Sequence, residues 1–125
     1  DLCVKSDIIS FHVPLSEETY SLIGADFFGR ISRKPLVINA SRGKIMDLNA
    51  AISALEKGQI SGLCLDVLPD EPPLKNDGYH DTNSYRRLFE FQDVMFSPHV
   101  AGWSKESYRK ISDRLLENIL KYKGL

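Results

Sequence analysis

The chain has 125 residues, 42% of them hydrophobic and 26% charged, with a net charge of −1. This length and composition suit one domain with a core of ordinary size. The charge provides no basic surface for nucleic acid, and the apolar runs fall far short of the roughly 20 residues that a membrane span needs. Cys3 and Cys64 lie far apart in sequence, so we expect no disulfide and a reducing, cytoplasmic location.

The first predicted elements are a strand and two short helices. Residues 8–13 form an apolar run that ends at Pro14, because proline lacks the N–H that a central strand donates. Ser16, followed by two glutamates, predicts a helix start. Gly24 interrupts that helix, and residues 25–31 predict a second one with an apolar face.

The middle of the chain predicts a strand, a helix and another strand. Residues 36–40 and 62–67 are the two apolar runs. Between them Asp47 is suited to be a helix N-cap and Gly58 to be a helix end. The apolar positions of this helix have the three–four spacing of one buried stripe: Leu48, Ala51, Ile52 and Leu55.

The last predicted elements are a long loop, a short helix, a strand and a long helix. The loop covers residues 69–82, and its length suggests a working role. Residues 85–91 predict the short helix, and residues 94–97 predict the strand. Ser104 caps the last helix, about residues 104–122. The apolar stripe of this helix consists of Tyr108, Ile111, Leu115, Ile119 and Tyr122.

Strands that alternate with helices and are apolar throughout predict the α/β class, with a parallel sheet covered on both faces. Ligands of such sheets bind outside the carboxyl ends of the strands. Polar segments follow all four predicted strand ends, so we expect them to share one rim: residues 12–14, residues 40–42, Asp66 with Glu71, and residues 99–102. Residues 1–7 run straight into the first strand, from which we expect a piece of a longer chain.

Arg42 and His99 have the clearest chemistry at this rim. Arginine offers a permanently charged, planar fork that matches a carboxylate, and imidazole exchanges protons near neutral pH. Each residue also has a structural interpretation: Arg42 as a partner of a surface acid, and His99 as a donor to a strand-end carbonyl. The residues alone leave both interpretations open.

Glu71 and Asp66 are carboxylates whose roles depend on their partners. A carboxylate bonded to His99 would fix the imidazole tautomer, and Glu71 is the candidate; the alternative is a solvated loop residue. Asp66 ends an apolar strand, where a charge needs a partner. It would either hold the amide of a nicotinamide ring or cap the next backbone turn.

Other residues give weaker signals. We interpret His12 and His80 as structural or solvated, and Trp103 as an aromatic residue that packs on the core. No two histidines stand at metal-ligand spacing, so we expect no metal site. Ser41 lies beside Arg42 without a nucleophile-elbow pattern, which argues against a serine nucleophile.

Four motifs in this order resemble the D-isomer-specific 2-hydroxyacid dehydrogenases, including those that act on phosphoglycerate. The resemblance is to the carboxyl-terminal part of their NAD-binding domain, and it covers about residues 6–120. The motifs are SDIISFHVPL at 6–15, INASRG at 38–43, GLCLDV at 62–67 with Glu71-Pro72, and SPHVAG at 97–102. The resemblance implies a Rossmann-type doubly wound parallel sheet, of which about four strands with flanking helices are present here.

The resemblance also implies roles for individual residues. Arg42 resembles the arginine that binds the substrate carboxylate, His99 resembles the general acid–base, and Glu71 resembles the carboxylate that orients it. Asp66 resembles the residue that holds the nicotinamide amide. The cofactor-binding positions implied in this way are His12, Val13, Pro14, Ala40, Ser41, Arg42, Asp66, His99, Ala101 and Gly102.

The implied activity is hydride transfer between NAD and a small D-2-hydroxy acid or 2-keto acid. It would belong to the complete protein, expected as a homodimer, with residues 1–125 a partial NAD-binding domain that is inactive alone.

The family's Gly-rich phosphate turn and ribose-binding acid precede these residues, so NADP stays an alternative to NAD. We expect the last helix to pack toward a substrate domain. Two other functions stay open: an NAD-sensing corepressor-like protein, and a non-catalytic interaction module on the same fold.

Overall fold

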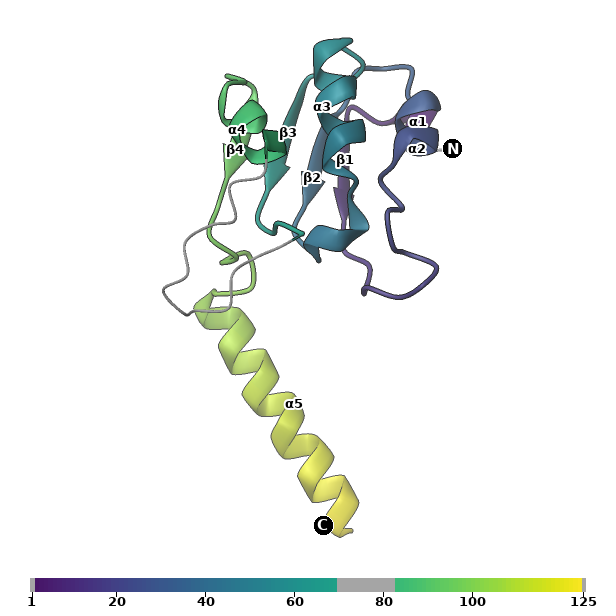
Figure 1. The fold of residues 1–125 in the computed structure, drawn as a ribbon. Helices are drawn as coiled ribbons and strands as arrows, with labels where there is room; N and C mark the ends of the chain where they lie inside the picture. The colour runs from purple at the N-terminus through teal and green to yellow at the C-terminus, as the bar shows by residue number, and fades with distance from the viewer. Residues whose placement is uncertain (1, 70–82, 125) are drawn as a thin grey trace.

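Four strands form one parallel sheet in the order β1-β2-β3-β4 (Figure 1). The computed structural model describes residues 2–69 and 83–124. The strands are Ile8–Phe11, Leu36–Asn39, Gly62–Leu65 and Val94–Phe96. The register aligns their last residues, which are Phe11, Asn39, Leu65 and Phe96. The predicted parallel sheet is confirmed, and each strand ends slightly earlier than its apolar run because the rim residues turn away from the ladder.

Helices precede, separate and follow the strands. They are α1 (Leu2–Lys5), α2 (Ala25–Gly29), α3 (Leu48–Glu56), α4 (Asn83–Phe89) and α5 (Lys105–Lys123), with one 3₁₀ turn, η1 (Gly43–Ile45). The main core cluster lies between α2, α3, α4 and one face of the sheet. Its fully buried members include Val37 and Leu63 from the strands, Ile52 from α3 and Leu88 from α4.

The other face of the sheet is more exposed in the described part of the chain. Ile8 is 61% exposed and Met95 is 68% exposed, while Ile38 and Cys64 are half-buried. The strands follow one another in a single direction across the sheet, and right-handed crossovers then put every connecting helix on the same side. The continuous apolar strands predict cover on both faces, whereas the described helices between the strands cover one.

The sheet also has an open edge at β1. Among the described residues β1 pairs only with β2, through a register that runs from Ile8 opposite Leu36 to Phe11 opposite Asn39. The outer side of β1 therefore has backbone N–H and C=O groups without a strand partner in residues 2–69 and 83–124.

The helix predicted from Ser16 is wrong, because this segment forms a turn instead. The Thr19 hydroxyl donates to the Pro14 carbonyl at 2.6 Å, and the Ser16 N–H donates to that hydroxyl at 2.8 Å. Tyr20 N–H closes one turn on the Ser16 carbonyl at 3.0 Å. Ser21 then has φ of 52°, a left-handed conformation that stops helix propagation.

The predicted caps are confirmed. The Asp47 carboxylate accepts from the N–H groups of Asn49 and Ala50 at the start of α3, and Gly58 just after it has φ of 61°. The Ser104 hydroxyl accepts from Ser107 N–H at 3.0 Å at the start of α5. The boundaries of two short helices differ from the prediction: α2 ends at residue 29 rather than 31, and α4 covers residues 83–89 rather than 85–91. Residues 2–5 form the short helix α1 instead of leading directly into the strand.

The last helix extends away from the sheet (Figure 1). None of its residues is buried, and its predicted apolar stripe is solvent-exposed in the structure. Trp103 just before it is 69% exposed, so the expectation that this ring packs on the core is wrong. No described helix combines the length and the apolar character that crossing a bilayer requires.

Some predictions lie outside the described residues or concern cysteines. Glu71, His80 and most of the loop at 69–82 fall in the part of the chain that is not described. Neither Cys3 nor Cys64 forms a disulfide, and both are half-buried.

Gly43 makes the closest backbone contact at the rim. A Cβ atom at this position would lie 1.9 Å from the carbonyl carbon of Leu68 and 2.3 Å from the nitrogen of Pro69. The turn after β2 therefore packs directly on the backbone that leaves β3, and only glycine allows this approach.

We expect Gly43→Ala to destabilise the fold strongly, because the clash is with backbone that cannot rotate away. The free energy of unfolding should fall by about 3 kcal/mol or more, as for overpacked sites. Urea unfolding of the full-length polypeptide measures it. Gly29→Ala is the matched control, since a Cβ there has no neighbour within 4 Å and alanine favours the helix. Equal unfolding midpoints for the two variants would contradict the packing described here.

Candidate active site at the carboxyl edge of the sheet

The predicted site residues follow the aligned ends of the four strands. His12 follows β1, Arg42 follows β2, Asp66 follows β3 and His99 follows β4. Since all strands are parallel, these residues lie at the same edge of the sheet. Neighbouring strands lie about 5 Å apart, so the ends of β2 and β4 are about 10 Å apart with β3 between them. A small organic acid fits between groups at that separation.

Asn39 organises the turn after β2 that contains Arg42. Its side chain is fully buried, and its Oδ1 accepts from the Ser41 N–H at 3.1 Å and the Ser41 hydroxyl at 3.0 Å. Its Nδ2 donates to the Arg42 carbonyl at 3.0 Å. The amide thus closes the turn from both sides, as asparagine does in Asx turns.

The Arg42 side chain is exposed at the rim. One guanidinium nitrogen, Nη1, donates to the Ser41 carbonyl at 2.7 Å, which fixes the side chain close to its own turn. Within residues 2–69 and 83–124 no carboxylate forms an ion pair with Arg42. The interpretation of Arg42 as a partner of a surface acid has no support from this part of the chain.

Asp66 joins the ends of β3 and β4. Its Oδ1 accepts from the Ser97 hydroxyl at 2.5 Å and from Val100 N–H at 2.9 Å, and its Oδ2 accepts from Ala101 N–H at 3.0 Å. The carboxylate therefore caps the turn after β4, which was one of its two predicted roles. Oδ2 has one of these bonds and can accept another from a ligand amide.

The pKa of Asp66 lies below its ordinary value of 3.8. Burial acts in the opposite direction and raises the pKa, because it disfavours the charged form. The hydrogen bonds from Ser97, Ala101 and Val100, together with the charge of His99, outweigh the burial. Asp66 is consequently a fixed negative charge at the turn of His99.

His99 stands in a left-handed backbone conformation, with φ of 56°. Its N–H donates to the Ser97 carbonyl at 3.0 Å across Pro98, and the next two N–H groups are held by Asp66. Strained conformations of this kind cluster at functional sites, where the surrounding contacts maintain them. The imidazole is exposed at the rim, where it is accessible to a ligand.

One groove brings together most of the predicted cofactor-binding residues. It has a volume of about 550 Å³, within the range of ligand pockets, and its lining is His12, Val13, Pro14, Leu15, Ala40, Ser41 and Arg42. The Ser10 hydroxyl and His12 Nε2 are 2.7 Å apart, which orients that imidazole. Asp66, His99, Ala101 and Gly102 do not line this groove and lie at the adjacent ends of β3 and β4.

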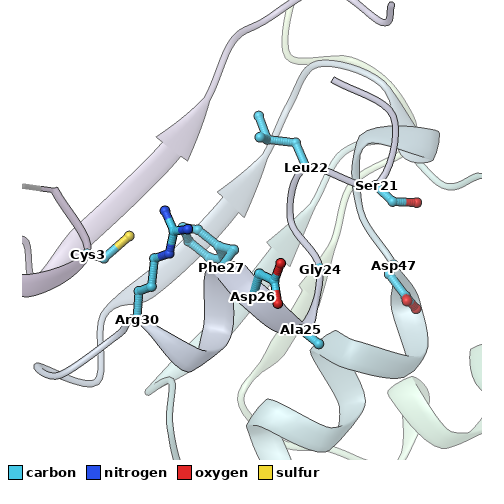
Figure 2. A pocket seen from close by; sticks show the side chains of 9 residues that line it. All are labelled: Cys3, Ser21, Leu22, Gly24, Ala25, Asp26, Phe27, Arg30 and Asp47. Atoms are coloured by element: carbon cyan, nitrogen blue, oxygen red, sulfur yellow. The ribbon is translucent and has the colours of Figure 1, made fainter. Parts of the chain in front are cut away.

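A second cavity of about 530 Å³ contains none of the predicted site residues (Figure 2). Its walls come from α1, α2, the segment between β1 and α2, and the N-cap of α3, with Cys3 and Arg30 at one end and Ser21 and Asp47 at the other. Within the described residues no group of three His, Cys, Asp or Glu side chains is arranged to hold a metal ion.

Sequence reasoning missed two residues that shape the site. Asn39 ends β2 and bonds to the turn that follows it, whereas Ser97 comes just after β4 and donates its hydroxyl to Asp66 at the end of β3. A polar residue at the last position of an apolar run was the available signal. Glu71 stays a prediction, because it lies outside the described residues.

The groove and the Asp66 carboxylate fit the nicotinamide half of a dinucleotide. Residues 12–14 and 40–41 line the groove, and Asp66 Oδ2 is an acceptor for an amide N–H. The 125 residues contain no Gly-x-Gly-x-x-Gly pattern for the phosphates. The residues present therefore suit part of the cofactor.

Residues 1–101 match the family model described as "D-isomer specific 2-hydroxyacid dehydrogenase, NAD binding domain". The chain is 36% identical over 122 residues to a glyoxylate reductase of Korarchaeum cryptofilum, covering 98% of this chain and 34% of the relative. It is 33% identical to D-3-phosphoglycerate dehydrogenase of Escherichia coli, covering 98% of this chain and 28% of the relative. The chain thus spans about a third of the length of these relatives.

Solved structures give the same similarity. D-lactate dehydrogenase with NAD+ from Lactobacillus jensenii has a TM-score of 0.78 and 33% identity, with 98% of this chain and 38% of that chain covered. D-lactate dehydrogenase from Aquifex aeolicus, complexed with NAD and lactic acid, has a TM-score of 0.76 and 30% identity, with 98% and 39% covered. The Rossmann-type fold class predicted from the sequence is confirmed as a part of that larger fold.

We expect Asp66→Asn to lower the free energy of unfolding by about 1–3 kcal/mol at pH 7, because an amide cannot accept all three hydrogen bonds. The folded pKa of Asp66 is depressed, so its ionised form stabilises the fold above the unfolded pKa. That contribution is lost as the pH falls below about 4, and the difference between variant and parent should shrink there. Urea unfolding at several pH values measures both.

Asp26→Asn, at an exposed position of α2, is the control and should change stability by less than about 0.5 kcal/mol. A difference for Asp66→Asn that stays constant down to pH 3 would contradict the role of the ionised carboxylate.

Proposed function

Because the chain belongs to the D-isomer specific 2-hydroxyacid dehydrogenase family, we propose that the polypeptide containing it transfers a hydride between NAD and a D-2-hydroxy acid or its 2-keto acid. The observation that most supports this proposal is the presence of a guanidinium and an imidazole on turns at one edge of a parallel sheet, next to a groove of about 550 Å³. When bound, NAD supplies the hydride acceptor or donor.

Arg42 binds the substrate carboxylate in this proposal. Its planar fork matches a carboxylate through two hydrogen bonds, and no described acid competes for it. Its turn is held by the buried Asn39, so the guanidinium approaches substrate from a fixed point. This grip orients C2 of the substrate for the reaction.

His99 is the general acid–base. It takes the proton of the C2 hydroxyl during oxidation and returns it to the carbonyl oxygen during reduction. The Asp66 carboxylate holds the turn of His99 and lies close enough for the two charges to attract. We propose that Glu71 orients the imidazole, as in the resemblance, since a carboxylate partner fixes the tautomer.

The groove between the ends of β1 and β2 would hold the cofactor. His12, Val13, Pro14, Ala40 and Ser41 line it, and Asp66 Oδ2 would accept from the carboxamide of the nicotinamide ring. Ala101 and Gly102 close the site from the turn after β4. NAD is proposed over NADP because the matching family model is an NAD-binding domain.

The whole polypeptide is proposed to contain a substrate domain and to act as a homodimer in the cytoplasm. The apolar stripe of α5 supports the first part, because its exposed Ile111 and Leu115 are suited to pack against that domain. Cys3 and Cys64, which form no disulfide, suit a reducing compartment.

We expect His99→Asn in the full-length polypeptide to lower kcat by about 10²–10⁴-fold, as for loss of an acid–base group, with NAD affinity nearly unchanged. Asparagine is the appropriate replacement because it tolerates φ of 56° better than alanine does. Steady-state kinetics and a fluorescence titration with NADH measure the two quantities. His12→Asn is the control with the opposite signature, a weaker NAD affinity with a smaller change in kcat. A His99→Asn enzyme as fast as its parent would remove the acid–base role.

We expect Arg42→Lys to lower kcat/KM for the 2-keto acid by about 10–100-fold, because an ammonium cannot make the two parallel hydrogen bonds of a guanidinium. The control is Arg33→Lys, which alters an exposed ion pair with Asp7. Kinetics with a series of small 2-keto acids measure both variants. Equal kcat/KM values for Arg42→Lys and Arg33→Lys would contradict the carboxylate-binding role.

A further inference from the structure

Three polar side chains are buried in the described part of the chain, and all of them lie at the proposed active site. They are Asn39, Ser41 and Asp66, with relative exposures of 0%, 8% and 7%. Every buried polar side-chain atom there has a hydrogen-bond partner. Burial of a polar group costs free energy unless the group is hydrogen-bonded. The hydrogen bonds within this cluster therefore stabilise one particular arrangement of the rim.

All three side-chain hydrogen bonds of Asn39 go to the turn that contains Arg42. Oδ1 receives the N–H and the hydroxyl of Ser41, and Nδ2 reaches the carbonyl of Arg42 itself. The Arg42 carbonyl also accepts from Ile45 N–H at 3.2 Å, the first bond of η1. Asn39 therefore sets the direction in which the Arg42 backbone leaves the sheet.

The main chain of Asn39 connects this turn to the one that contains His99. Asp66 N–H donates to the Asn39 carbonyl at 3.0 Å, and the Asp66 carboxylate holds the N–H groups on the far side of His99. One residue on β2 and one just after β3 thus hold the two functional turns, and a single backbone hydrogen bond joins them.

We propose that Asn39 is a positioning residue, which acts through Arg42 to set where the guanidinium meets the substrate carboxylate. This inference rests on the proposed function. Asn39 has no role in the chemistry itself, because its amide is buried and its hydrogen bonds go to Ser41 and Arg42 within the turn. Asparagine suits the position because it supplies an acceptor and a donor on one short side chain.

The test is a mutant cycle in the full-length polypeptide with Asn39→Ser, which removes the donor to the Arg42 carbonyl. We expect KM for the 2-keto acid to rise about ten-fold while kcat falls less, as for one lost hydrogen bond that acts on binding. In an Arg42→Ala background the same substitution should hardly change KM, because the group that Asn39 positions is gone. If Asn39 had a merely structural role, Asn39→Ser would raise KM by the same factor with Arg42 present and in the Arg42→Ala background.

Ser41→Ala is the milder second variant, should Asn39→Ser yield no folded protein. It removes one bond to Asn39 Oδ1, and KM should rise about three-fold with Arg42 present and not in the Arg42→Ala background. Equal effects in both backgrounds, or no effect in either, would overturn the positioning role. If Arg42→Ala itself leaves KM unchanged, the carboxylate-binding role of Arg42 fails, and the proposed function fails with it.

Discussion

The interaction on which the site depends is the set of hydrogen bonds made by the Asp66 carboxylate. It accepts from Ser97, Val100 and Ala101, and so attaches the turn after β4 to the end of β3. His99, in its left-handed conformation, lies between the residues that these hydrogen bonds hold. Without these bonds the imidazole would lie on a free turn, since β4 is short and the helix that follows extends away from the sheet.

The rim combines buried residues that fix its turns with exposed residues that a ligand can reach. Asn39 and Asp66 are buried beneath the rim, whereas Arg42 and His99 are exposed above it. Gly43 adds a third constraint, because it allows the turn after β2 to touch the backbone that leaves β3. Because these contacts fix the turns in advance, Arg42 and His99 can bind one small acid without rearrangement of the site.

Much of the fold could be predicted, because the apolar runs and the caps at Asp47 and Ser104 are local signals. The turn at Ser16 could not, because Thr19 competes for the backbone through its hydroxyl, which a propensity argument does not weigh. Arg42 and His99 were identifiable as residue types after strands. The roles of Asn39 and Ser97 depend on contacts across turns and between strands, which a linear pattern does not reveal.

The open side of β1 has a consequence for handling these residues in isolation. Unpaired peptide groups on an outermost strand are a template for a strand of another molecule, especially where an apolar side chain such as Ile8 on β1 is exposed to solvent. Neither a lysine nor a proline interrupts β1, whose sequence is IISF. Concentrated preparations of this segment would therefore self-associate through intermolecular β-pairing, and added charge on β1 would improve its solubility.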